Sequence, residues 1–224
     1  MDTKDKTLSK SQNQTMRLTV SAVLIALGTV LSLFKFFEMP FGGSVTLCSM
    51  LPLLLIGAMY GVKWGLLSGL VYGILQAVLG ATMSQAFAGQ GALSVVLICI
   101  LDYLLAFMVI GLSGMFLKGG NKKVLMLSLG SLAAMLLRYV CHVVSGALLY
   151  GSWAEWYFTQ DGFYSWGQTI LDKFSGASLS LVYSLIYNAF YLLPEVILTM
   201  VVAVIIFSVK PLQKYIFSNV QTQE

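Results

Sequence analysis

SLSLVYSLIYNAFYLLPEVILTMVVAVIIFSV, at residues 178–209, contains a single charged residue, Glu195. A helix of about 20 apolar residues is long enough to cross a bilayer. Similar runs recur along the 224-residue chain, in which 58% of residues are apolar and only 10% are charged. Soluble domains have about 25% charged residues. The sequence therefore predicts an all-α, multi-pass membrane protein, and it excludes a soluble domain, a disordered tail and a nucleic-acid-binding protein.

The apolar runs predict six transmembrane helices, at about 16–37, 46–61, 64–83, 92–117, 124–150 and 178–209. The second and third are short and are joined only by Gly61-Val62-Lys63, so a five-span interpretation stays open. The predicted organisation is a polar N-terminal segment at 1–15, a six-helix substrate-binding domain at 16–209, and a C-terminal tail at 210–224. Both terminal segments are expected in the cytoplasm.

The positive charges support this orientation. The chain has a formal net charge of +4 and 13 basic residues. Ten of them fall on one predicted side of the membrane: Lys4, Lys6, Lys10, Arg17, Lys63, Lys118, Lys122, Lys123, Lys210 and Lys214. An excess of Lys and Arg marks cytoplasmic loops. The distribution therefore predicts that both termini are cytoplasmic, as an even number of spans requires.

Four ionisable residues lie inside the predicted spans: Asp102, Arg138, His142 and Glu195. Such residues are costly in lipid and are candidates for function. At a rise of about 1.5 Å per residue, Asp102 and His142 lie roughly 15 and 12 Å from the outer ends of their helices. Asn188 lies about 15 Å deep by the same rise, beside a tyrosine stripe with spacing four. Three helices therefore bring polar and aromatic groups to one level, as a site for a flat, polar, cationic ring would require.

Structural roles are the alternatives for these residues. Arg138 could form an intramembrane ion pair with Asp102, or it could lock the bundle by pairing with the deeper Glu195. His142 could be a hydrogen-bonded interior residue, and the tyrosines could simply pack the helices. The agreement in depth between three helices, rather than any single residue, favours a binding site.

Signals for catalysis, metals and cofactors are weak. One histidine and three cysteines without a CxxC pair give no metal-binding set and no disulfide framework. No GxSxG, HExxH or P-loop motif occurs, so we expect no enzyme, no catalytic residue, no cofactor and no metal. Without a P-loop, the chain cannot itself drive transport with ATP.

Small residues in the first predicted span suggest a helix-packing surface. Ala22 and Ala26 lie four residues apart and so share one helix face. Small-xxx-small patterns allow two helix backbones to approach closely in lipid. Glycines also recur with spacing four from Gly57 to Gly73, which indicates tight packing within the bundle.

Four motifs together resemble the substrate-binding S components of energy-coupling factor (ECF) vitamin transporters, and most closely the thiamine-specific S component. They are PFGGSVTL at 40–47, LDYLLAF at 101–107, RYVCHVVSG at 138–146 and VYSLIYNAFYLLPE at 182–195. The resemblance covers about residues 16–209. It implies a prokaryotic plasma-membrane protein that binds thiamine from outside.

The resemblance also implies the site residues Asp102, Tyr103, His142, Gly146, Tyr183 and Asn188. An aromatic residue just after the fifth helix stacks on the ligand in that family, which here implies Tyr150 or Trp153. Some members carry Glu in place of Asp102, and some carry Trp in the first outer loop, where this chain has Gly43.

The expected partners follow from the same resemblance. Ala22 and Ala26 would dock a transmembrane coupling protein that works with two cytoplasmic ATPases. An S component for another vitamin or for a pyrimidine precursor is the alternative in the same class. An intramembrane enzyme or a scaffold is the alternative in a different class.

Overall fold

The structure is a computed structural model that describes residues 3–39, 43–83, 87, 89–117 and 122–220. Its principal helices are α1 (Thr3–Leu33), α2 (Leu51–Met83), α3 (Ala92–Ile98), α4 (Ala106–Met108), α5 (Lys123–Leu149), α6 (Ala154–Phe158), α7 (Tyr164–Lys173), α8 (Gly176–Ser208) and α9 (Lys210–Val220). A π-helix (Cys99–Leu105) joins α3 to α4, and 3-10 helices occur at Val109–Gly114, Gly151–Trp153 and Asp161–Phe163. Strands β1 (Lys35–Glu38) and β2 (Ser44–Thr46) form a short antiparallel pair.

Five helical segments in the described part of the chain are long and apolar enough to cross a membrane. They are Asn13–Leu33, Leu51–Thr82, Ala92–Gly114, Lys123–Leu149 and Gly176–Ser208. The prediction of an all-α membrane protein is therefore confirmed. The predicted count of six differs from this number because α2 contains the third predicted span and most of the second. The second predicted span begins at Thr46, which lies in β2, and its helix begins only at Leu51.

A sharp reversal divides α2 into two arms. Gly61 has φ 78° and ψ 170°, which is outside the helical region and in the half of the map that favours glycine. A Cβ atom placed on Gly65 would lie 2.9 Å from the Cα of Gly57, so the two arms pack directly against each other. The first arm, Leu51–Tyr60, rises only about 15 Å and reaches halfway through a bilayer.

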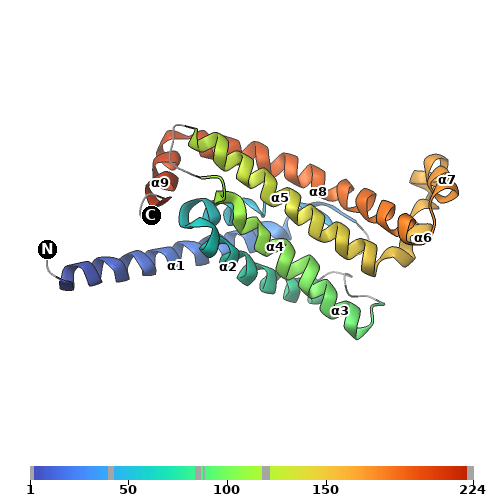
Figure 1. Cartoon of the computed structure of the whole chain (residues 1–224), viewed down its shortest axis with the longest axis horizontal. Coiled ribbons are helices and arrows are strands. Elements are labelled where there is room, and N and C mark those ends of the chain that lie inside the picture. Colours follow the sequence, from blue (N-terminus) through green and yellow to red (C-terminus); the bar gives the residue numbers. More distant parts are fainter. Residues whose placement is uncertain (1–2, 40–42, 84–86, 88, 118–121, 221–224) are drawn as a thin grey trace.

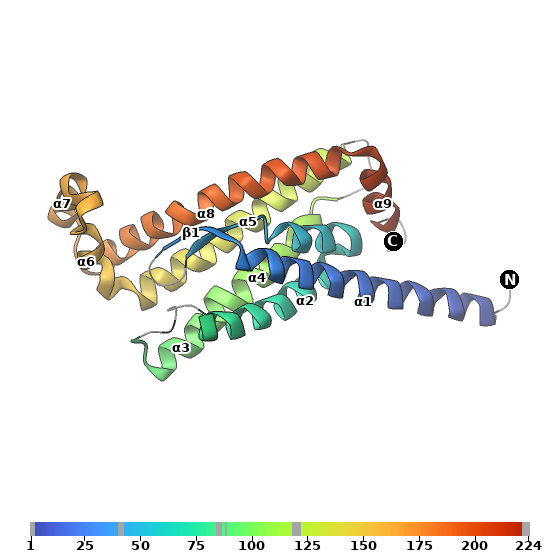
Figure 2. The same ribbon diagram turned by 180° about the vertical axis from the view of Figure 1, so that it is seen from behind.

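The two terminal segments are helical and end on the same side. The polar residues predicted as a separate segment belong to α1, which begins at Thr3. α9 folds back against the short arm of α2, where Ile216 and Phe217 join Ile56 and Tyr60 in one apolar cluster. Figures 1 and 2 show the start of α1 and the whole of α9 at the same end of the molecule, in agreement with an even number of passes.

Glycines allow the long arm of α2 to pack closely against the α3–α4 segment. A Cβ on Gly69 would meet the carbonyl oxygen of Phe107 at 2.5 Å, and one on Gly73 would meet that of Tyr103 at 2.6 Å. Gly65 similarly faces the backbone of Gly111. The predicted tight packing of the spacing-four glycines is therefore present, with Gly61 serving as the turn rather than as a contact.

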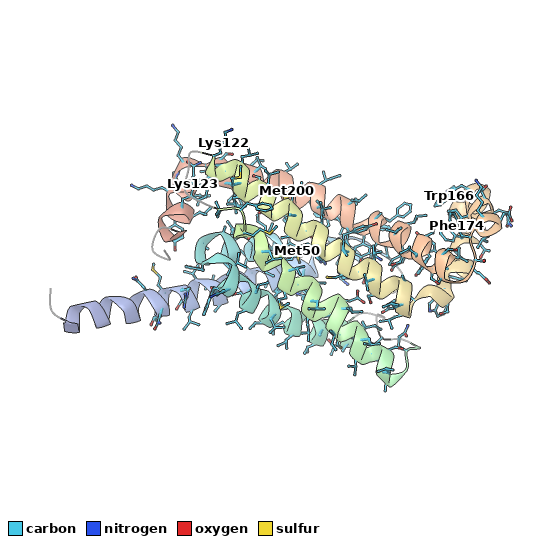
Figure 3. The ribbon with its side chains drawn as sticks, in the orientation of Figure 1. Met50, Lys122, Lys123, Trp166, Phe174 and Met200 are labelled. Carbon is cyan, nitrogen blue, oxygen red and sulfur yellow. The ribbon has the colours of Figure 1, made fainter. Side chains whose placement is uncertain are left out.

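The opposite ends of the bundle differ in character. Figure 3 shows Lys122 and Lys123 at the end near α9, and Trp166 and Phe174 at the far end on and beside α7. α5 and α8 run side by side between these ends, and the β1–β2 pair lies along them (Figure 2). The short helices α6 and α7 lie at the far end, between the end of α5 and the start of α8 (Figure 1).

Candidate functional site

A pocket with an empty volume of about 630 Å³ lies between the α3–α4 segment, α5 and α8. Its lining consists of Gly43, Ile98, Asp102, Tyr103, Phe107, His142, Gly146, Tyr150, Tyr183, Tyr187, Asn188 and Tyr191. One carboxylate, one imidazole, one amide and five phenols therefore face a single cavity.

The carboxylate of Asp102 is held by two side chains of α5. The Nδ1 atom of His142 lies 2.8 Å from Oδ1 of Asp102, and the hydroxyl of Ser145 donates a hydrogen bond to Oδ2. Both side chains of the Asp–His pair are largely buried, with 15% and 11% of their surfaces exposed. Each carboxylate oxygen keeps a further lone pair for a ligand.

Two further features shape the Asp102–His142 pair: the backbone conformation at Asp102 and the unpaired second ring nitrogen of His142. Asp102 lies in the π-helix Cys99–Leu105, and π-helical turns within α-helices are frequent at functional sites. The Nε2 atom of His142 is buried and has no hydrogen-bond partner in the described part of the chain. Because Nδ1 is bound to Asp102, Nε2 is the ring atom left for a ligand.

On α8, Asn188 is fixed by its neighbours. Its Nδ2 donates to the carbonyl oxygen of Ser184 at 2.8 Å, and its Oδ1 accepts from the hydroxyl of Tyr191 at 2.7 Å. The Nδ2 atom also lies 3.3 Å from the carbonyl oxygen of His142, which joins α8 to α5. These contacts set the orientation of the amide, so Asn188 presents a pre-oriented group to the pocket.

Gly146 provides the closest contact between α5 and α8. A Cβ atom at this position would overlap the hydroxyl of Ser184, which donates to the carbonyl oxygen of Val143 at 2.7 Å. A larger residue would therefore push the two helices apart at the level of the pocket. The backbone of Gly146 is helical and any residue could adopt it. Glycine is therefore required here for the close approach of the two helices and not for its backbone conformation.

Aromatic rings form most of the remaining wall. Tyr183, Tyr187 and Tyr191 follow one another along α8 with ring centroids 5.6 and 6.0 Å apart. From α6, Tyr157 packs on the first two at 5.2 and 5.8 Å. Burial raises the pKa of Tyr157 to about 12, so its phenol is neutral near pH 7. On the other side, Tyr103 stacks on Phe87 at 5.7 Å.

Seven of the eight residues proposed from the sequence as substrate-binding line this pocket: Asp102, Tyr103, His142, Gly146, Tyr150, Tyr183 and Asn188. Trp153 does not. It is 37% exposed in the 3-10 helix after α5, where its ring packs edge-on against Trp156 at 6.0 Å. Between the two aromatic residues that could follow the fifth helix, the structure therefore places Tyr150 in the pocket.

Sequence reasoning did not select Gly43, Ile98, Phe107, Tyr187 or Tyr191, which also line the pocket. The spacing-four stripe on α8 was the signal for the two tyrosines. Gly43 could not be placed from the sequence, since its proximity to Tyr191 depends on how β2 packs against α8. Residues 40–42 of the PFGGSVTL motif lie outside the described residues.

Both ion pairs considered for Arg138 are absent from the described residues. Asp102 is bound by His142 and Ser145 instead. Glu195 accepts hydrogen bonds from the backbone N–H of Thr46 at 2.6 Å and from its hydroxyl at 2.8 Å. The interpretation of Arg138 and Glu195 as a bundle-locking ion pair is therefore wrong. Glu195 instead fastens β2 to α8.

The predicted docking residues lie away from the pocket. Ala22 and Ala26 are both exposed on α1, the helix at the edge of the bundle in Figures 1 and 2. The neighbouring apolar residues Val23 and Leu27 are 61% and 46% exposed. This face is open to lipid or to a partner helix.

The chemistry of the pocket suits binding rather than catalysis. No group of His, Cys, Asp and Glu that could hold a metal ion occurs among the residues the structure describes. A buried carboxylate surrounded by tyrosines can attract a cationic ring through charge and through ring faces. The imidazole and the oriented amide can form directional hydrogen bonds with ring nitrogens or an amino group.

Comparisons with known proteins agree with this architecture. Residues 18–215 match the family model described as thiamine transporter protein. The thiamine transporter ThiT of Bacillus subtilis (strain 168) is 32% identical over 209 residues, covering 88% of this chain and 93% of that protein. A solved structure of ThiT from Listeria monocytogenes superposes with a TM-score of 0.60 at 22% identity, over 89% of this chain and 97% of that one, and shares the fold.

Proposed function

The chain belongs to the thiamine transporter protein family, and on that premise we propose that it is the thiamine-binding S component of an ECF-type uptake transporter. It is a multi-pass membrane protein and a transporter subunit rather than an enzyme. The observation that carries the proposal is the Asp102 carboxylate, held by His142 and Ser145 inside a pocket of tyrosines.

Thiamine combines an aminopyrimidine with a positively charged thiazolium ring. Asp102 supplies the negative charge that pairs with the cation or accepts from the amino group. The bare Nε2 of His142 and the remaining lone pair of the Asn188 Oδ1 provide directional contacts for the aminopyrimidine. Tyr150 and the tyrosines of α8 offer ring faces for the flat heterocycles.

Transport requires an energy source that this chain does not provide. We therefore propose that a transmembrane coupling protein and two cytoplasmic ATPases complete the transporter. The exposed small residues Ala22 and Ala26 on α1 support a docking surface there, because they permit close helix–helix contact in lipid. In this arrangement, ligand binding and partner docking use different helices.

Calorimetric titration of the purified full chain in detergent tests the ligand. The panel is thiamine, riboflavin, the isolated aminopyrimidine alcohol and the isolated thiazole alcohol. Saturable one-to-one binding of thiamine, with much weaker binding of each half, is the expected result. Tight binding of riboflavin or of the pyrimidine alone, without thiamine binding, would assign the chain to another ligand.

A further inference from the structure

A second cavity, with an empty volume of about 950 Å³, adjoins the proposed thiamine pocket. Tyr103, Phe107 and Tyr191 line both, so these three rings form the wall between them. Most residues in the rest of its lining are polar, and they come from α1, β1, β2, the turn before α2, α2, α5 and α8: Ser32, Leu33, Lys35, Ser44, Thr46, Ser49, Met50, Tyr72, Gln76, Leu79, Gly80, Arg138 and Glu195. We call it the Arg138 cavity.

Arg138 is the charged group at its inner end. Its side chain is only 8% exposed, and its Nε and Nη1 atoms are buried without a hydrogen-bond partner. The guanidinium lies over the ring of Phe107, 4.8 Å from the centroid. A buried guanidinium is costly unless its charge and its donors are satisfied. The face of the Phe107 ring compensates part of the positive charge of the guanidinium, but it cannot accept the hydrogen bonds of the Nε and Nη1 donors.

The carboxylate that lines the same cavity forms no ion pair with Arg138 in the described structure. Glu195 is 1% exposed, and its two oxygens accept the hydrogen bonds of Thr46. No ion pair joins it to Arg138 among the described residues. The cavity also contains a second cation, Lys35, at its outer side, where it pairs with Glu38 at 2.6 Å. The lining therefore includes two cations and one carboxylate that is already bound.

Neutral donors surround the same space. The hydroxyl of Ser44 and the amide of Gln76 line it, and the Nε2 of Gln76 directs one hydrogen to Ser32 at 3.0 Å and has a second hydrogen available. The Ser49 hydroxyl also lines the cavity, but it donates to the Thr46 hydroxyl, which in turn donates to Glu195. Guanidinium with hydroxyl and amide donors is a set that recognises the oxygens of phosphate. An apolar ligand would leave these donors unsatisfied.

We propose that the Arg138 cavity binds a phosphoryl group, with Arg138 as its principal ligand. Two sources share this chemistry: free inorganic phosphate, and the phosphate ester of a phosphorylated ligand whose rings occupy the adjacent pocket. Because the two cavities share the wall of Tyr103, Phe107 and Tyr191, a ligand with its rings in the thiamine pocket has the Arg138 cavity directly beside it. Only this second source rests on the proposed thiamine function.

The first experiment uses inorganic phosphate as the probe. Thermal unfolding of the full chain in detergent is followed against phosphate, with sodium chloride matched for ionic strength. A saturable rise in Tm with phosphate is expected if free phosphate is a source. The rise should be lost in Arg138→Gln and in Gln76→Glu, which places a carboxylate in the cavity. Lys173→Gln, which removes a charge elsewhere, should retain it.

The second experiment compares thiamine with thiamine monophosphate by calorimetry. In the parent, Arg138 should favour the ester, so Arg138→Gln weakens ester binding by about ten-fold or more while thiamine affinity changes less than about three-fold. Gln76→Glu should act in the same direction, which keeps the test valid if Arg138→Gln does not fold. If Arg138→Gln weakens binding of the ester and phosphate does not raise Tm, the phosphate ester is the source. If phosphate raises Tm and ester binding is unaffected, free phosphate is the source.

The proposal is overturned if phosphate gives no saturable shift and the two variants weaken thiamine and its monophosphate equally. It is also overturned if phosphate stabilises the parent and both cavity variants to the same extent, because the anion then binds elsewhere. Failure of thiamine to bind the parent would reject the proposed function, and the phosphate titration would still test the cavity.

Discussion

The Nδ1 atom of His142 lies 2.8 Å from Oδ1 of Asp102, although the two residues are 40 positions apart in the chain. This contact joins the π-helix that follows α3 to the middle of α5. It also leaves the second ring nitrogen of His142 without a hydrogen-bond partner in the described structure, in a residue that lines the pocket. The same side-chain pair therefore lines the pocket and holds two helical segments together.

Replacing Asp102 with Asn should weaken thiamine binding by about 30- to 150-fold, because the loss of a charged hydrogen-bond partner costs about 2–3 kcal/mol. Calorimetry on the folded variant measures the effect. Asp172→Asn on α7 is the matched control, since it removes a carboxylate from an exposed site. Parental affinity in a folded Asp102→Asn protein would contradict the role given to this carboxylate.

Ser145 should act as a positioning residue through its hydrogen bond to Asp102. Ser145→Ala leaves the carboxylate with one fewer donor, and we expect thiamine affinity to fall about five-fold, equivalent to about 1 kcal/mol. Ser131→Ala is a close control on the same helix, because the Ser131 hydroxyl is buried and has no partner in the described structure. Equal losses in both variants would show that the effect is general to buried serines of α5.

Gly146→Ala should separate α5 from α8, since the new Cβ overlaps the hydroxyl of Ser184. Overpacking of this kind costs about 1–3 kcal/mol, so both Tm and thiamine affinity should fall. Removing the obstructing hydroxyl in the double variant Gly146→Ala/Ser184→Ala should restore part of the loss. Gly91→Ala, where a Cβ meets no atom within 4 Å, should behave as the parent.

Glu195 should contribute to the stability of the fold more than to thiamine binding. Glu195→Gln replaces a double acceptor with a group that has one acceptor oxygen, so the two donors of Thr46 can no longer both be satisfied. We expect a lower Tm, by an amount equivalent to about 1–3 kcal/mol, with nearly unchanged thiamine affinity in the folded fraction.

The pairing itself can be measured with a double-mutant cycle on Glu195→Gln and Thr46→Val. A stabilising coupling between the two sites is expected because they share hydrogen bonds. Normal stability together with a large loss of thiamine affinity in Glu195→Gln would instead place Glu195 among the ligand contacts.

Docking on α1 should be separable from thiamine binding. The double variant Ala22→Trp/Ala26→Trp should bind thiamine as the parent does, and it should lose uptake and co-purification with the ATPase complex. The bulky rings prevent close approach of a partner helix. Replacement by Leu should give a milder defect. Ile197→Trp, at a 65% exposed position on α8, is the control, with parental uptake expected.

Normal uptake by the double Trp variant would show that α1 contacts only lipid at this face. Equal loss of thiamine binding and uptake would show that α1 supports the pocket helices.

The depth of the polar residues could be predicted because long helices have a regular rise. Counting from the helix ends placed Asp102, His142 and Asn188 at one level, and all three line the same pocket. The glycine spacing likewise predicted close packing of α2. These inferences depend only on periodicity within one helix, which the sequence displays directly.

Contacts that depend on how separate segments fold together could not be predicted. Thr46 reaches Glu195 across 149 residues because β2 lies along α8. Depth alone suggested Arg138 as the partner of Glu195, since both were placed far from the outer surface. The reversal at Gly61 lies where the sequence joined its second and third predicted spans. The five-span alternative stayed open because a glycine at spacing four fits a continuous helix face as well as a turn.

The short arm of α2 bears on how the protein enters the membrane. Ten residues rising about 15 Å are too few for the insertion machinery to treat as a span, and unpaired backbone groups are not tolerated in hydrocarbon. Leu53 and Ile56 are at most 1% exposed, and they cluster with residues of α8 and α9 that are synthesised last. We therefore expect the arm to reach its buried position only after the C-terminal helices have been synthesised.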